Sequence, residues 1–117
     1  MPDAATILDG LNTAQREAAE ATRGPVAILA GAGTGKTTTI TRRIAWQVAS
    51  GAFQPSQILA VTFTQKAAGE LRQRLARLGV EGVEARTFHA AALHQLGGLW
   101  EQASGSRLPT DVRWLCC

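Results

Sequence analysis

The stretch AILAGAGTGKTTTITRRI, residues 27–44, places a cluster of glycines and one lysine between an apolar run and an amphipathic segment. The run VAILA at 26–30 is wholly apolar, which is typical of a strand covered on both faces of a parallel sheet. Beyond the glycines, one face of a predicted helix that continues to about Ser50 carries apolar residues four apart: Ile40, Ile44 and Val48. The stretch therefore predicts a strand, a loop and a helix in succession.

The composition of this loop indicates phosphate binding. Glycines let successive backbone N–H groups turn inward around phosphate oxygens at a helix N-terminus, as in a P-loop. Lys36 supplies a point charge for the β- and γ-phosphates and is the predicted catalytic residue, while the Thr37 hydroxyl is a predicted Mg²⁺ ligand. The alternative is a glycine-rich turn with an incidental lysine, which the strand before it and the helix after it disfavour. The predicted ATP-binding residues of this segment are Ala30, Gly31, Ala32, Gly33, Thr34, Gly35, Lys36, Thr37 and Thr38.

Length and composition set the class of protein. A chain of 117 residues forms one domain at most, and 45% hydrophobic with 18% charged residues fits a soluble globular protein. The net charge of +3 permits a polyanionic partner without requiring one. The N-terminus lacks the basic and apolar regions of a secretory signal, and no apolar run approaches the about 20 residues of a membrane span. We therefore expect a cytoplasmic protein without a membrane partner, and assign no chemistry to the adjacent Cys116 and Cys117.

Helices and strands alternate along the rest of the chain. The periodicity predicts helices at 11–22 and 66–78, strands at 57–63 and 82–88, and a helix from residue 89 that Gly97 and Gly98 interrupt. We expect a solvated helix face to carry three arginines: Arg72, Arg74 and Arg77. This alternation predicts an α/β fold in which helices flank a parallel sheet.

Four segments of the chain, in this order, resemble motifs of the superfamily-1 DNA helicases of the UvrD/Rep/PcrA type. They are LNTAQREA at 11–18 (Q motif), AGAGTGKT at 30–37 (motif I), ILAVTFTQKAAGELRQRL at 58–75 (motif Ia with its helix) and ARTFHA at 85–90 (motif Ib). The resemblance covers about residues 11–100 and accounts for Ala30, where the strict P-loop pattern asks for glycine. It implies a partial RecA-like P-loop NTPase domain at 11–103, preceded by a tail at 1–10 and followed by a divergent tail at 104–117.

In this family, motifs Ia and Ib contact single-stranded DNA. Phe63 offers a face for base stacking, with ordinary core packing as the alternative, and His89 would otherwise be an ordinary residue at a helix start. Gln65 stands where many members have asparagine, and Thr38 where many carry an arginine near the nucleotide. The implied DNA-binding residues are Thr62, Phe63, Thr64, Gln65, Lys66, Arg86, Thr87, Phe88 and His89.

Gln15 has two interpretations. The family resemblance implies that its amide reads the adenine edge, which an amide can contact through two hydrogen bonds. The alternative is a capping box, in which Gln15 is the partner of Asn12 at the start of a helix.

Hydrolysis of the nucleotide requires carboxylates at positions where this sequence has none. P-loop enzymes hold Mg²⁺ with an acid from a second apolar strand, whereas here no acid after Lys36 follows an apolar run: Glu70, Glu81, Glu84, Glu101 and Asp111. The resemblance implies an ATP-dependent 3′–5′ DNA helicase acting on single-stranded DNA or a single/double-strand junction. For this chain, without the rest of the helicase and its second motor domain, we expect weak nucleotide binding, negligible turnover and poor solubility from unpaired sheet edges.

A function of another class stays open at this point. A small P-loop kinase or regulatory nucleotide-binding module would also need the loop at 30–37, but would not bind DNA. Titration with a single-stranded oligonucleotide separates the two interpretations, because a helicase fragment binds it with steep salt dependence and a kinase does not.

Overall fold

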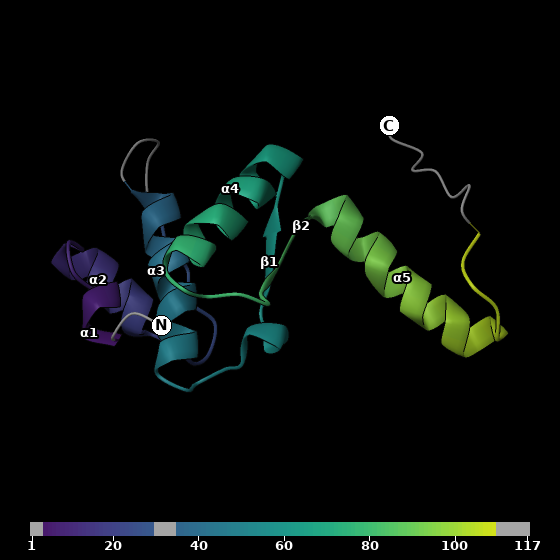
Figure 1. The fold of residues 1–117 in the computed structure, drawn as a ribbon, viewed down its shortest axis with the longest axis horizontal. Coiled ribbons are helices and arrows are strands. Elements are labelled where there is room, and N and C mark those ends of the chain that lie inside the picture. The colour runs from purple at the N-terminus through teal and green to yellow at the C-terminus, as the bar shows by residue number, and fades with distance from the viewer. Residues whose placement is uncertain (1–3, 30–34, 110–117) are drawn as a thin grey trace.

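The computed structural model describes residues 4–29 and 35–109. The sheet has two strands, and Figure 1 shows it between the N-terminal helices and the last helix. The elements are α1 (Ala4–Ile7), α2 (Thr13–Glu20), α3 (Lys36–Ala49), a 3₁₀ turn η1 (Pro55–Gln57), β1 (Leu59–Thr62), α4 (Gln65–Arg77), β2 (Glu84–Thr87) and α5 (Phe88–Ser104). The α/β class and the parallel sheet predicted from the sequence are confirmed.

The two strands are hydrogen-bonded in parallel, and helix α4 is the crossover connection between them. Their register sets Leu59 opposite Glu84 at one end and Thr62 opposite Thr87 at the other. Because parallel strands end at the same edge, the residues that follow β1 and β2 lie side by side. This register is what brings the two predicted DNA-binding segments together.

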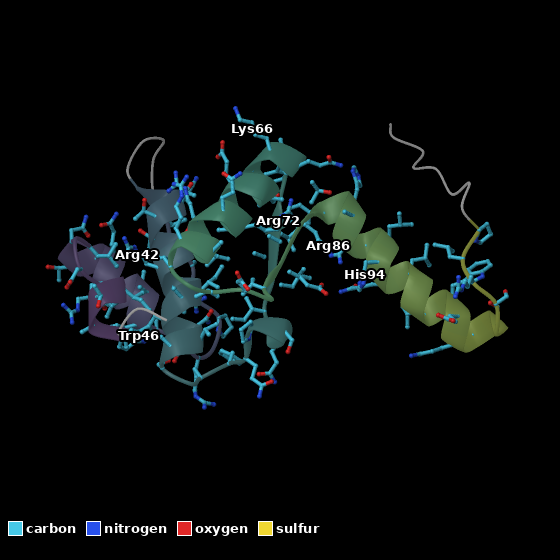
Figure 2. The ribbon with its side chains drawn as sticks, viewed as in Figure 1. Arg42, Trp46, Lys66, Arg72, Arg86 and His94 are labelled. Atoms are coloured by element: carbon cyan, nitrogen blue, oxygen red, sulfur yellow. The ribbon has the colours of Figure 1, made fainter. Side chains whose placement is uncertain are left out.

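The core lies where α3 and α4 meet the sheet. Its buried residues come from α1, α3, α4, β2 and the loop before β2: Ile7, Ile44, Ala45, Leu71, Leu75, Val80 and Ala85. Ile7 and Leu75 are its largest fully buried side chains, and each contributes about 1.5–3 kcal/mol by leaving water. The short helix α1, which no sequence pattern predicted, belongs to the core through Ile7, whose carbonyl accepts a hydrogen bond of 3.1 Å from Arg42 of α3 (Figure 2).

The predicted strand at 26–30 is wrong over 26–29, the part that the structure describes. This segment has no strand conformation, and Leu29 is 95% exposed. Among the described residues, the strand neighbours are β1 and β2 alone, so nothing pairs with the backbone of 26–29. An apolar run becomes a buried strand only where other strands and helices cover it, and its composition alone does not supply them.

The predicted interruption of the last helix is also wrong. Helix α5 runs without a break through Gly97 and Gly98, and ends at Gly105, whose φ of 71° is left-handed. Each interior glycine destabilises the helix by about 1 kcal/mol relative to alanine, and the helix-forming residues on both sides offset this loss. Figure 1 shows α5 extending away from the rest of the molecule.

Candidate functional site

The N-terminus of α3 presents the described part of the predicted phosphate loop. Gly35 is the N-cap with φ of 80°, and no side chain among the described residues caps the helix. Lys36 and Thr37 are exposed in the first turn, at the positive end of the helix dipole, where N–H groups lack intrahelical partners. Ala30, Gly31, Ala32, Gly33 and Thr34 lie outside the described residues.

Neighbouring threonines of α3 face the interior and leave this turn open. The Thr39 hydroxyl donates to the Gly35 carbonyl at 3.0 Å, and the Thr41 hydroxyl to the Thr37 carbonyl at 2.7 Å. Both threonines are buried, so their hydroxyls are satisfied within the helix. The exposed polar groups of this turn are consequently the Lys36 ammonium and the Thr37 hydroxyl. The ammonium is suited to phosphate oxygens, and the hydroxyl oxygen is suited to a hard cation.

Gln15 lies next to the start of α3. The capping box is confirmed: Gln15 N–H donates to Asn12 Oδ1 at 2.8 Å, and Asn12 N–H donates to Gln15 Oε1 at 3.0 Å. A Cβ placed on Gly35 would lie only 2.6 Å from Gln15 Nε2, so the amide reaches the end of the phosphate loop. Capping the helix and approaching the loop are thus properties of the same side chain.

A groove of about 340 Å³ joins the start of α3 to the end of β1. Thr37 lines it from α3 and Thr62 from the carboxyl end of β1, and most of its wall is apolar. Ligands in open α/β proteins bind at the carboxyl ends of the strands. The groove therefore places the predicted phosphate-binding turn and the first predicted DNA-binding segment at the same end of the sheet.

Two phenylalanines lie in contact beyond the strand ends. Phe63 follows β1 and Phe88 begins α5, directly after β2, with ring centroids 5.3 Å apart and planes tilted by 43°. Phe63 is 91% exposed and Phe88 55%. Core packing of Phe63, the alternative considered for the sequence, is therefore wrong.

Polar residues surround this aromatic pair. Thr64 and Thr87 cap α4 and α5, accepting from Ala67 N–H and Ala90 N–H at 3.1 Å each, and Lys66 extends from the first turn of α4 (Figure 2). A cleft of about 190 Å³ between α4, β2 and α5 is lined in part by three predicted DNA-binding residues: Gln65, Arg86 and Thr87. His89 is exposed in the first turn of α5.

Two arginines make contacts in this region that sequence reasoning did not find. Arg72 is exposed, as are Arg74 and Arg77, which agrees with the expected solvated face, and its Nη1 also donates to the carbonyl of Ala85 in β2 at 2.6 Å (Figure 2). Arg86 Nε is buried and lies 3.6 Å from a Glu84 carboxylate oxygen, which is an ion-pair distance and beyond a hydrogen bond. No periodicity within α4 could reveal that Arg72 reaches the neighbouring strand.

The acidic residues after Lys36 do not gather at the strand ends. Glu70 lies on α4, Glu81 precedes β2, Glu84 begins β2 and Glu101 lies on α5, while Asp111 is outside the described residues. Within residues 4–29 and 35–109, no group of three or more His, Cys, Asp or Glu side chains could hold a metal ion.

The described helices do not include one with the length and apolar character to cross a bilayer. The fold and site together define an open α/β protein with exposed Lys36 and Thr37 at one helix start and an aromatic pair at the strand ends. The chain belongs to the UvrD/REP helicase N-terminal domain family, whose model matches residues 11–113.

Curated relatives support this assignment. The chain is 54% identical over 116 residues to the ATP-dependent DNA helicase UvrD2 of Mycobacterium bovis, in an alignment covering 92% of this chain and 16% of the relative. It is 45% identical over 100 residues to DNA helicase II of Haemophilus influenzae, covering 86% of this chain and 12% of that protein. It is 47% identical over 95 residues to the ATP-dependent DNA helicase PcrA of Leuconostoc citreum, covering 78% and 13% respectively. The chain thus spans only a small part of the relatives it matches.

Proposed function

We propose that this chain is the opening part of an ATP-dependent 3′–5′ DNA helicase, in which it binds ATP at the start of α3 and single-stranded DNA at the ends of β1 and β2. The observation that carries the DNA-binding half is the exposed contact between Phe63 and Phe88. Exposing two large aromatic rings to water at neighbouring strand ends is unfavourable, and stacked bases would cover this apolar surface. In the whole helicase, hydrolysis would drive unwinding at a single/double-strand junction.

The ATP-binding half rests on the open first turn of α3. Unpartnered N–H groups and the Lys36 ammonium attract the triphosphate, and the Gln15 amide, which lies within reach of the same loop, contacts the adenine base. Mg²⁺, when bound, would neutralise phosphate charge, with the Thr37 hydroxyl as the ligand from this chain. Because no described carboxylate directly follows the carboxyl end of β1 or β2, we expect this chain alone to show negligible DNA-stimulated ATPase activity.

The kinase alternative gains no support from the strand ends, where the exposed groups are aromatic rings and basic side chains. A kinase would require acceptor-binding groups near the nucleotide rather than a stacking surface. DNA binding therefore distinguishes the proposed function from its alternative.

Substitution of the aromatic pair tests the proposal. Phe63→Ala and Phe88→Ala should each weaken binding of a labelled oligothymidylate, measured by fluorescence anisotropy at low salt, by about 1–3 kcal/mol, or roughly 5- to 150-fold. The matched control is Trp100→Ala, an aromatic residue 42% exposed near the far end of α5, which should leave the affinity unchanged. An unchanged affinity in both phenylalanine variants, or wild-type protein that ignores the oligonucleotide at every salt concentration, contradicts the proposal.

A further inference from the structure

We propose that Asn12 is a positioning residue for nucleotide recognition, because it holds the Gln15 amide in one of its two orientations. The inference rests on the proposed function in one respect, the contact between Gln15 and the base. The orientation itself follows from the contacts of this chain.

The reciprocal bonds between Asn12 and Gln15 determine which atom of the amide lies where. The backbone N–H of Asn12 can only donate, so the Gln15 atom 3.0 Å away must be the oxygen Oε1. If the amide turned by half a rotation, Nε2 would face that N–H as donor to donor, and the bond would be lost. The second bond, from Gln15 N–H to Asn12 Oδ1 at 2.8 Å, keeps the two residues in register at the first turn of α2.

With Oε1 directed to Asn12, Nε2 is directed to Gly35. A Cβ on residue 35 would lie 2.6 Å from Nε2, which is closer than real contacts allow, and the next nearest atom is the amide carbon of the same side chain at 3.9 Å. The φ of 80° at Gly35 favours glycine, and a Cβ there would also force the Gln15 amide to move. Asn12 thus fixes the orientation of the amide, and Gly35, which has no Cβ, leaves room for Nε2 beside the start of α3.

A fixed amide discriminates between purine bases. Adenine presents a donor and an acceptor side by side, which a glutamine amide in the correct orientation can match with two hydrogen bonds. Guanine presents two acceptors at the same positions, so the fixed oxygen would oppose one of them. An amide free to rotate could turn its nitrogen toward either base, and the preference for adenine would fall.

The first arm of the test needs no nucleotide. We expect nuclear Overhauser contacts between the Gln15 side-chain amide protons and the Gly35 α-protons in the wild-type chain and in Asn12→Asp, which keeps an N-cap oxygen. Asn12→Ala keeps the backbone N–H that bonds Oε1 but removes the Oδ1 bond that holds the two residues in register, so it should lose these contacts. Arg16→Gly is the matched control: it removes the exposed Arg16–Glu20 pair and weakens α2 without touching the capping box, and should keep the contacts.

The second arm measures displacement of a fluorescent ATP analogue by ATP and by GTP. Asn12→Ala should lower the ratio of ATP to GTP affinity by at least about fivefold, as should Gln15→Ala, while Asn12→Asp and Arg16→Gly keep the wild-type ratio. If Asn12→Ala keeps the ratio that Gln15→Ala loses, or if Arg16→Gly loses it equally, Asn12 is only a helix cap and the inference is overturned. If Gln15→Ala itself keeps the ratio, the adenine contact in the proposed function fails, and the first arm still decides the orientation.

Discussion

Thr64 and Thr87 illustrate how single residues at the strand ends serve structure and site together. Each side-chain oxygen accepts a hydrogen bond from a backbone N–H in the first turn of the following helix. A threonine hydroxyl that accepts in this way still carries its own O–H donor. Capping is therefore compatible with the predicted contact to DNA phosphate, and the caps keep Phe63 and Phe88 at the points where the chain turns from strand to helix.

The role of Lys36 in nucleotide binding can be tested by a single substitution. Lys36→Ala should weaken binding of a fluorescent ATP analogue by about 1.5–3 kcal/mol, because it removes a charge-assisted contact to phosphate at an exposed helix start. Isothermal titration or fluorescence measures the loss. Lys66→Ala, an exposed lysine in the first turn of α4, is the control and should leave nucleotide affinity unchanged. Equal losses in the two variants would mean that the effect is one of net charge.

Among the elements, α5 depends least on the rest of the protein. It contacts the sheet at its beginning, while residues toward its other end are exposed: Leu96, Leu99 and Trp100 at 39%, 64% and 42%. Its stability therefore depends on helix propensity and capping more than on packing. Gly97 and Gly98 are its weakest positions, because glycine has a low helix propensity. A Cβ at either position would meet nothing within 4 Å.

Alanine at these positions should strengthen the helix. Gly97→Ala should increase the protection of α5 amides against hydrogen exchange by about 0.5–1 kcal/mol, because it reduces the backbone freedom lost on folding without any clash. Gly105→Ala provides the contrast: with φ of 71° at the C-cap, it should decrease protection. Lower protection in Gly97→Ala would show that α5 has packing which the exposed surface does not reveal.

At the scale of the whole molecule, the sheet is the part that is least protected from association with other copies. One edge of β1 pairs with β2, and its other side borders the apolar groove with α3 and α4. In the apolar segment 26–29 of the same chain, Val26 and Leu29 are exposed. An open strand edge and an exposed apolar segment both favour association between copies.

Self-association is the prediction that follows. Sedimentation velocity over increasing concentration should show oligomers of the wild-type chain, and Leu29→Lys or Leu59→Lys should shift the population toward monomer by introducing charge at the two exposed apolar sites. Leu99→Lys, on α5, is the control for a general gain in solubility and should have little effect. A wild-type chain that stays monomeric and melts in one sharp transition would contradict the prediction.

The sequence determined the features that depend on near neighbours in the chain. The capping box at Asn12 and the stripe that buries Leu71 and Leu75 in α4 were both predictable, because caps and helix faces are formed by residues three or four apart. The phosphate-loop signal at 30–37 is local too, although only Gly35 and the residues after it lie in the described part.

Only the tertiary structure decided the features that need a distant partner. It left 26–29 unpaired, because a strand forms through hydrogen bonds to a neighbour and not through its own composition. It also set Gln15 against Gly35, and it brought Phe63 to Phe88 through the parallel register of β1 and β2. Residues so far apart in sequence meet only when the helices and the sheet pack, so no spacing along the chain could specify these contacts.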